Sequence, residues 1–341
     1  MQEYFKKIFF HFGKQLCESI RYPFIPYLVS NHLSMQNTSR RKFFQTSAVL
    51  TASAMIGSSF TFKKQKPLLS FSTLGCPDWP FNKILSFAGQ NNYDGIELRG
   101  ILHEMDLTKC KEFADVTSIA ATMQLMKNNN LKFVDLGSSC MLHFPEGDDR
   151  NKNLDEGKRF IDLAQKINCP YIRVFPNIFP KDQSREATID LITKGLASLG
   201  NYANGSNVTV LVESHGDLVH IDDLQTVMKA AAGPHVGMVW DVTNMWTITG
   251  ESPADAYKAL KPFIHHTHIK DAAKINNEVH YKLLGEGEVP IFTAIDALRA
   301  GGYDGYYSFE WEKLWHPEIG EPEVALADYP VKMKKHFEQT K

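Results

Sequence analysis

The sequence has no excess of charge of either sign, no closely paired cysteines and no long apolar run. Its 341 residues include 37 Lys and Arg and 39 Asp and Glu, which gives a net charge of −2. So balanced a chain has no general attraction for nucleic acid or an anionic membrane, and a small molecule is the expected partner. The five cysteines, at 17, 76, 110, 140 and 169, lack any C-x-x-C spacing, which indicates neither a disulfide framework nor a zinc cluster.

The N-terminal part carries a pattern typical of protein export. Residues 39–44, S-R-R-K-F-F, precede a mildly apolar run at 48–56, and this pairing resembles a twin-arginine signal. The run is too short and too rich in Ser and Thr to span a bilayer. We therefore expect 35–66 to be an export signal and linker, 1–34 to be an over-extended start upstream of Met35, and the mature protein to be periplasmic or otherwise exported. A genuine aromatic, amphipathic arm at 1–34 is the alternative.

From Leu68 onward, short apolar runs alternate with segments of helical periodicity. Unbroken apolar runs suit strands buried on both faces of a parallel sheet, and the other segments have the 3.6-residue spacing of amphipathic helices. Strands are expected at 68–74, 93–98, 131–136, 171–175, 208–213, 236–240, 263–269 and 306–309. Helices are expected at 81–90, 116–129, 153–167, 185–203, 221–231, 253–260, 291–300 and 323–338. Eight such units, within a span near the usual ~250 residues, predict a single (β/α)8 TIM barrel with 67–341 as the catalytic domain.

Charged side chains stand at the ends of the last four predicted strands. The run N-V-T-V-L-V-E-S-H-G at 207–216 ends in Glu213, and the next three runs bring Asp241, His268 and Glu310 to the same position. Buried charges are costly unless they bind something, and the active sites of such barrels lie at the C-terminal ends of the strands. The four side chains are therefore predicted to share one ion. Three carboxylates and one imidazole suit Mn²⁺, which we favour, or Mg²⁺ or Co²⁺, with Zn²⁺ as a further option.

Six motifs together resemble the xylose-isomerase-like barrels, a family that includes sugar isomerases and epimerases, inosose dehydratase and hydroxypyruvate isomerase. The motifs are Y-D-G-I-E-L-R at 93–99, V-L-V-E-S-H-G at 210–216, V-W-D at 239–241, H-T-H-I-K-D at 266–271, L-G-E-G-E-V-P at 284–290 and G-Y-D-G-Y-Y-S-F-E-W-E at 302–312. The resemblance implies that Glu213, Asp241, His268 and Glu310 bind a divalent metal ion. It also implies that Glu213 and Glu310 form an acid/base pair that moves protons on a sugar.

Two departures from the family pattern bear on the substrate. Ketose epimerases of this family commonly place a histidine three residues after the metal-binding aspartate, where this chain has Asn244. They also place an arginine shortly after the metal-binding histidine, whereas Lys270 follows His268 here and the next arginine is Arg299. A free ketohexose is therefore not the expected substrate.

Other residues near the predicted strand ends are candidates for binding substrate. Each has a structural alternative: His215 could orient a carboxylate, Lys270 could pair with Asp271 or another acid, and Glu97 could pair with Arg99. His266 is expected to be a packed core histidine, and the turn at 285–287 is expected to lead into a helix rather than to bind phosphate. The substrate-binding candidates are His215, Lys270, Glu97, His143, Arg173 and Asn244.

These patterns predict a metal-dependent isomerase or epimerase that acts on a keto-sugar or related polyol through an enediolate. A metal ion chelated by a carbonyl and the adjacent hydroxyl acidifies the C–H bond between them, and a carboxylate can then remove the proton. A lyase or dehydratase acting on a keto-sugar or 3-keto-glycoside is the first alternative, and a non-catalytic carbohydrate-binding barrel is the second. A nuclease for apurinic sites would need a basic groove, which the net charge disfavours. The sequence leaves open whether copies of the chain form a homo-oligomer.

Overall fold

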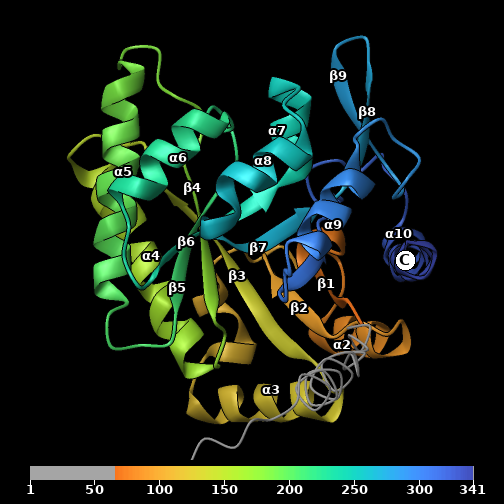
Figure 1. The fold of residues 1–341 in the computed structure, drawn as a ribbon. Coiled ribbons are helices and arrows are strands. Elements are labelled where there is room, and N and C mark those ends of the chain that lie inside the picture. The colour runs from red at the N-terminus through yellow and green to blue at the C-terminus, as the bar shows by residue number, and fades with distance from the viewer. Residues whose placement is uncertain (1–65, 341) are drawn as a thin grey trace, which may run out of the picture. The chain divides into compact units, whose positions relative to one another are not determined.

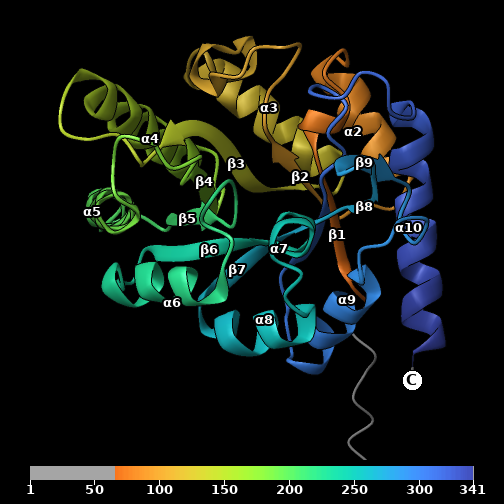
Figure 2. The same cartoon turned by 90° about the horizontal axis from the view of Figure 1, so that it is seen from above.

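A computed structural model of the protein describes residues 66–340, which form a closed barrel of parallel strands with helices outside it. The arginine pair and apolar run of the expected export signal lie outside the described residues. The strands follow the order β1-β10-β7-β6-β5-β4-β3-β2 around the barrel. Figures 1 and 2 show the helices arranged around the outside of these strands. This arrangement confirms the predicted TIM-barrel fold.

Each barrel strand pairs in parallel with its two neighbours, so all eight strands end at the same face of the barrel. The strands are β1 (Leu68–Ser72), β2 (Gly95–Leu98), β3 (Lys132–Met141), β4 (Tyr171–Phe175), β5 (Thr209–Glu213), β6 (Val236–Asp241), β7 (Ile264–Ile269) and β10 (Tyr306–Phe309). Their apolar side chains fill the core between the strands and the outer helices.

The helices occupy the segments between the strands and after the last strand. They are α2 (Phe81–Gln90), α3 (Val116–Asn128), α4 (Asp148–Lys166), α5 (Arg185–Tyr202), α6 (Ile221–Ala230), α7 (Val242–Thr249), α8 (Pro253–Leu260), α9 (Ile291–Ala300) and α10 (Pro322–Gln339). Single 3₁₀ turns lie at Thr73–Gly75, Leu107–Lys109, Lys111–Phe113 and Lys261–Phe263. Within residues 66–340, none of the helices combines the length and the apolar character needed to cross a bilayer.

Several elements differ from the sequence expectation, among them α4, which begins five residues earlier than expected, at Asp148. β1 ends at Ser72 and turns into a 3₁₀ helix, β3 runs five residues further than expected to Met141, and α7 was not expected. At the start of α7, the Asp241 side chain accepts a hydrogen bond from the N–H of Asn244 and caps the first turn. At its end, Gly250 has a left-handed φ of 70°, which stops the helix. Both are ordinary helix-terminus signals. Asp241 thus has two roles, because it ends β6 and also caps α7.

A two-stranded hairpin, β8 (Asp271–Ile275) and β9 (Glu278–Lys282), was also not expected. Its turn is formed by Asn276 and Asn277, whose φ angles of 54° and 65° lie in the left-handed region that two-residue hairpin turns require. The hairpin projects from the same end of the barrel as α7 (Figure 1). This end is the C-terminal face of the strands, because α7 follows β6 directly and β8 follows β7.

Phe309 fixes the last barrel strand against the C-terminal helix. Its side chain is fully buried, and its ring stacks on Tyr329 of α10 with a centroid distance of 4.6 Å. Since side chains alternate along a strand, this outward anchor leaves the next residue, Glu310, directed into the barrel.

Replacing Phe309 with Ala is expected to lower the free energy of unfolding by about 3–5 kcal/mol, because it removes a large buried ring and leaves a cavity. Urea denaturation monitored by circular dichroism measures the change. Val331→Ala on α10 is the matched control, since Val331 is 63% exposed and its truncation should change stability by less than about 0.5 kcal/mol. Equal effects of the two substitutions would contradict the anchoring role of Phe309.

Candidate active site

The structure brings the four predicted metal ligands together at the C-terminal face of the barrel. Glu213 ends β5, Asp241 ends β6, His268 lies near the end of β7 and Glu310 directly follows β10. One ligand atom from each residue lies within 4.8 Å of those from the other three, and no side chain of the four is more than 5% exposed. The register explains the convergence, because Asp241 of β6 and Ser308 of β10 both lie opposite His268.

His268 is at the centre of this cluster. Its Nδ1 lies 3.3 Å from Glu310 Oε1, 3.4 Å from Glu213 Oε1 and 3.8 Å from Asp241 Oδ2. Burial alone would lower the pKa of His268, but the carboxylates of Glu310, Glu97 and Glu213 outweigh burial and raise it well above its usual value. Without an ion, the site therefore holds its negative charges together partly through a protonated histidine.

The donor set fits a divalent cation. Among the described residues, Glu213 Oε2, Asp241 Oδ2 and His268 Nδ1 are buried and have no hydrogen-bond partner, although ion pairs reach both carboxylates. Buried polar atoms in native proteins almost always have partners, so such a cluster is typical of a site that binds a ligand. Three carboxylates and one imidazole nitrogen, with no thiolate among them, suit a hard metal ion with open coordination positions.

Arg173 pairs with one of the two glutamates. It lies within β4, is 1% exposed, and places its Nε 3.1 Å from Glu213 Oε2. Its guanidinium also lies 3.8 Å from the centre of the Phe175 ring. Burial raises the pKa of Glu213, but His268 and Arg173 outweigh it and the net shift is downward, so the carboxylate is ionised at neutral pH.

Lys270 bridges the metal cluster and a further carboxylate. Its Nζ lies 2.8 Å from Asp241 Oδ2 and 2.7 Å from Glu310 Oε2, and it also donates to Glu312, which accepts from the hydroxyl of Tyr281 on the hairpin. The structural alternative for Lys270, pairing with Asp271 or another acid, is therefore met by these three acids, and Asp271 is not among them. Burial opposes the charge on Lys270, but its three acidic partners raise its pKa well above the usual value.

Asp271 instead shapes the loop after β9. Its Oδ2 accepts hydrogen bonds from the backbone N–H groups of Gly285 and Gly287 at 2.8 and 3.1 Å. A Cβ atom at Gly287 would lie 2.1 Å from Asp271 Oδ1, so only glycine fits this close approach. The turn therefore has a partner within the protein, and it leads into α9 from Ile291, as the sequence suggested.

Glu97 occupies a different position from the expected one. It does not pair with Arg99: its carboxylate is fully buried and accepts from His266, His268 and Ser308. The structure therefore places the Glu97 carboxylate behind His268, among protein partners, and the substrate-binding role of Glu97 stays a prediction. His266 is buried, as expected for a core histidine, and contributes one of these hydrogen bonds.

Three other candidates lie near the strand ends with different contacts. His215 packs its ring against Phe175 at 4.8 Å, and His143 packs against Phe144 at 4.1 Å. The Nδ1 atom of each histidine is buried and has no hydrogen-bond partner among residues 66–340. Asn244 contacts the cluster through its backbone: its N–H donates a hydrogen bond to Asp241 Oδ1, and this bond caps the start of α7.

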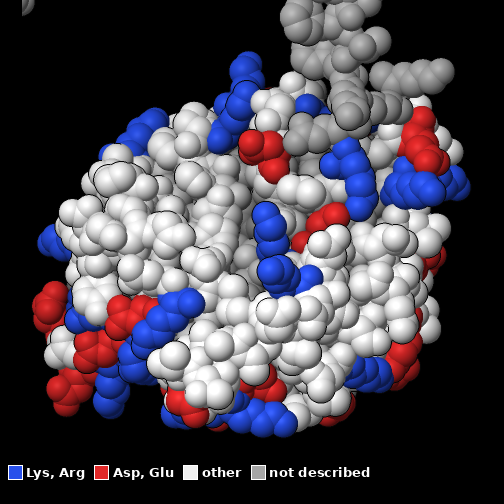
Figure 3. Space-filling view, turned by 90° about the horizontal axis from the view of Figure 1, so that it is seen from below, with Lys and Arg blue, Asp and Glu red and all other residues white. Residues whose placement is uncertain are grey.

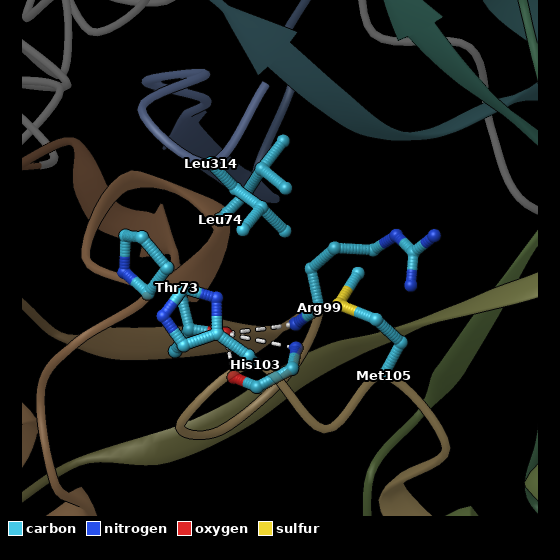
Figure 4. Close-up of a pocket in the computed structure, with 8 residues that line it drawn as sticks. Thr73, Leu74, Arg99, His103, Met105 and Leu314 are labelled. Carbon is cyan, nitrogen blue, oxygen red and sulfur yellow. Dashed lines mark hydrogen bonds between the residues drawn. The ribbon is translucent and has the colours of Figure 1, made fainter. Parts of the chain in front are cut away.

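A small pocket opens next to Arg99 between the loops that follow β1, β2 and β10 (Figure 4). The Thr73 hydroxyl connects two loops of the pocket wall, since it donates to the carbonyl of Gly100 and accepts from the N–H groups of Arg99 and Gly100.

The Arg99 side chain extends toward Gly137, where an added Cβ would lie 2.7 Å from Arg99 Cδ and 2.9 Å from Arg173 Nη2. Burial and Arg173 together lower the pKa of Arg99 to about 9. The pocket is lined by Thr73, Leu74, Pro77, Arg99, Gly100, His103, Met105 and Leu314.

Asp135 is a buried carboxylate that sequence reasoning missed. It lies opposite Glu97 in the pairing of β3 with β2, is fully buried, and neither of its oxygens has a hydrogen-bond partner among the described residues. Burial and the neighbouring charge of Glu97 raise the pKa of Asp135 to about 8. The one available signal was an acid in the middle of the apolar run at 131–136.

Asp135→Asn is expected to change how stability depends on pH in the metal-free protein. The carboxyl pKa is about 8 in the folded protein against 3.8 in the unfolded chain, so between these values the folded state binds the extra proton. The unfolding free energy of the wild type therefore falls by about 1.4 kcal/mol per pH unit from this group as the pH rises, and the contribution present below about pH 4 is lost by about pH 8. The variant lacks this fall, so it should gain stability relative to the wild type between pH 5 and 8.

Urea unfolding at several pH values measures this difference. Asp304→Asn changes an exposed acid and should follow the wild-type curve. Parallel curves for Asp135→Asn and the wild type would contradict a protonated Asp135.

On the face shown in Figure 3, basic and acidic side chains are interspersed over the surface. That face thus offers no extended basic groove of the kind that nucleic-acid binding uses.

The chain belongs to the xylose isomerase-like TIM barrel family, which it matches over residues 85–328. The family comprises enzymes, among them epimerases, isomerases and dehydratases. Among curated proteins, 3-dehydroshikimate dehydratase from Bacillus anthracis is 23% identical over 252 residues, or 68% of this chain and 85% of that protein. Uncharacterized protein YihM from Escherichia coli (strain K12) is 22% identical over 231 residues, or 65% of this chain but only 63% of YihM's own length.

Solved structures share the barrel at low identity. The 3-keto-D-glucoside 4-epimerase YcjR from E. coli, in its apo form, superposes with a TM-score of 0.63 and 16% identity over 79% of this chain and 100% of YcjR. The IolI protein with a bound zinc atom superposes with a TM-score of 0.65 and 15% identity over 79% of this chain and 97% of IolI. At this identity the likeness shows the fold alone.

Proposed function

We propose that the protein is a divalent-metal-dependent isomerase or epimerase that acts on a keto-sugar or related polyol by removing a proton next to a carbonyl. The observation that carries this proposal is the convergence of Glu213, Asp241, His268 and Glu310 at the mouth of the barrel. When bound there, a metal ion would acidify the C–H bond beside a chelated carbonyl and stabilise the resulting enediolate.

Glu213 and Glu310 supply the acid and the base. Burial works against both charges, but His268 with Arg173, and His268 with Lys270, lower the respective pKa values, so each carboxylate is ionised and able to accept a proton. One glutamate removes the proton from carbon, and either the same glutamate returns it or the other glutamate, after taking up a proton from solvent, delivers that proton. A return from the opposite side gives an epimer, while a return to the neighbouring carbon gives an isomer.

Other residues would hold the substrate and balance its charge. Lys270 keeps a positive charge beside Glu310, which favours the negative charge that develops on substrate oxygen. His215 and His143 each have a buried ring nitrogen without a protein partner, so each can bind a substrate hydroxyl. Asn244 and Lys270 stand where related ketose epimerases have histidine and arginine, which argues against a free ketohexose.

Mn²⁺ is the ion we favour, because the set of three carboxylates and one imidazole is rich in oxygen. The zinc atom in the IolI structure supports a divalent metal in this kind of barrel and makes Zn²⁺ the main competitor. Measurement of activity after reconstitution with each ion separates the two.

A dehydratase or lyase is the second candidate, supported by the sequence match to a 3-dehydroshikimate dehydratase. Such a reaction also begins with proton removal next to a carbonyl, but then expels an oxygen substituent instead of returning the proton. Lys270 and the Tyr281 hydroxyl, which both donate to Glu312, lie beside the cluster and could donate hydrogen bonds to a leaving oxygen.

Incubation of metal-loaded protein with keto-sugars and 3-keto-glycosides in heavy water tests the proposal. Deuterium at the carbon next to the carbonyl supports proton abstraction, a new stereoisomer marks the epimerase, and loss of water or an aglycone marks the lyase. Binding across the panel without any exchange would contradict both and support a carbohydrate-binding protein.

We further propose that the enzyme is exported by the twin-arginine route, on the strength of Arg40-Arg41 and the apolar run after them. N-terminal sequencing of the native mature protein tests this. A mature product that begins at Met1 would overturn it.

A further inference from the structure

We propose that Glu97 is a positioning residue of the metal centre, which holds His268 in the tautomer protonated at Nε2 so that Nδ1 faces the metal. This inference rests on the metal site proposed above. It adds a residue from the opposite side of the barrel, since β2 and β7 are separated by β1 and β10 in the strand order.

The two ring nitrogens of His268 face different surroundings. Nδ1 points into the cluster formed by Glu213, Asp241 and Glu310, at 3.3–3.8 Å from their oxygens. Nε2 points the other way and lies 3.2 Å from Glu97 Oε2. With a metal ion in the cluster, Nδ1 would have to offer its lone pair, and the single N–H of the neutral ring would then lie on Nε2, where the Glu97 carboxylate accepts it. Hydrogen bonds of this type are how metal-binding histidines are oriented elsewhere in proteins.

Glu97 also accepts hydrogen bonds from side chains of β7 and β10. His266 Nε2 lies 3.0 Å from Glu97 Oε2 and Ser308 Oγ donates to the same oxygen at 2.9 Å, while the carboxylate is completely shielded from solvent. His266 and Ser308 thus fix the carboxylate at the height of His268. Because His266 already uses its Nε2 toward Glu97, it supports the orientation of His268 and is not needed as a metal ligand.

A buried charge is tolerated only with such partners, so an alternative role for Glu97 is to stabilise the fold without affecting the metal site. The structural role and the positioning role predict different experimental effects. A purely structural carboxylate alters the stability of the metal-free protein, whereas a positioning carboxylate alters metal affinity and the protonation pattern of His268.

The experiment compares Glu97→Gln, which keeps the shape and removes the charge, with Ser308→Ala, which removes a hydrogen bond to the same carboxylate without touching His268. Zn²⁺ affinity is measured by competition with a chromophoric chelator, and the thermal midpoint of each metal-free protein is recorded beside it. Glu97→Gln should weaken Zn²⁺ binding by about 10–100-fold. Ser308→Ala should weaken it by less than about threefold. Glu97→Asp, which keeps the charge on a shorter side chain, should lie between the two.

The wild type provides a second measurement that does not depend on any variant folding. Long-range ¹H–¹⁵N spectra of the Zn²⁺-loaded protein should show His268 bound through Nδ1, with a slowly exchanging proton on Nε2. Binding through Nε2 would overturn the inference, as would equal Zn²⁺ affinities of the wild type and Glu97→Gln. If the wild type binds neither Zn²⁺ nor Mn²⁺, the proposed metal enzyme fails and this inference fails with it. If the wild type binds the ion but Glu97→Gln binds it equally well, only this inference fails, so the two failures are distinguishable.

Discussion

Replacement of Glu310 with Gln is expected to reduce solvent-deuterium exchange into substrate by about 10²–10⁴-fold, the usual contribution of one acid/base group. The substitution leaves the size of the side chain unchanged and removes the base whose Oε1 and Oε2 face His268 and Lys270. Exchange is measured by mass spectrometry with excess metal ion, and the bound metal is quantified in the same samples.

Glu310 is both a proposed ligand and a proposed base, so metal content must be matched before rates are compared. Glu318→Gln is the control, because its carboxylate lies on the same loop but is 69% exposed and outside the cluster. Full exchange by metal-saturated Glu310→Gln would remove this residue from the acid/base pair. A large loss in Glu318→Gln would point to a general effect of the loop instead.

Removal of the metal ion should abolish exchange and lower the thermal stability of the protein. Three buried carboxylates around His268 repel one another in the absence of a cation, and an ion that binds only the folded state stabilises it. At a metal concentration a hundred times the Kd, the gain is about 2.7 kcal/mol. Activity after dialysis against a chelator, and the thermal midpoint with and without Mn²⁺, measure the two effects.

His268→Ala should lose both responses, because it removes the single nitrogen ligand and the contact shared by all three carboxylates. His280→Ala on the exposed hairpin is the matched control and should respond to Mn²⁺ as the wild type does. Undiminished exchange after verified metal depletion would contradict the metal-dependent mechanism. A Mn²⁺-induced stabilisation that persists in His268→Ala would place the ion elsewhere in the protein.

The barrel and the four proposed ligands could be predicted because both are marked locally in the sequence. An apolar run predicts a strand buried on both faces, and a charged residue at its end then lies on the C-terminal face of any parallel barrel. Glu213 and Asp241 each follow this pattern, so their convergence required no knowledge of long-range contacts. A sign of the β8–β9 hairpin was also local: Asn276-Asn277 precedes the alternating segment E-V-H-Y-K at 278–282.

The partners of the buried charges could not be predicted, because they come from distant parts of the chain. Glu97 meets His268 and Ser308 across 171 and 211 residues, and Lys270 meets Glu310 across 40. Which of these charges pair depends on strand register and on the interior shape of the closed barrel. Asp135 was missed for a related reason: an acid in the middle of an apolar strand gives no local sign of which side chains surround it.

Anomalous diffraction from crystals soaked in Mn²⁺ tests the central claim most directly. The account predicts one strong anomalous peak enclosed by Glu213, Asp241, His268 and Glu310, with His268 bound through Nδ1. A peak elsewhere in the barrel, or no peak between these four side chains at saturating Mn²⁺, would contradict it.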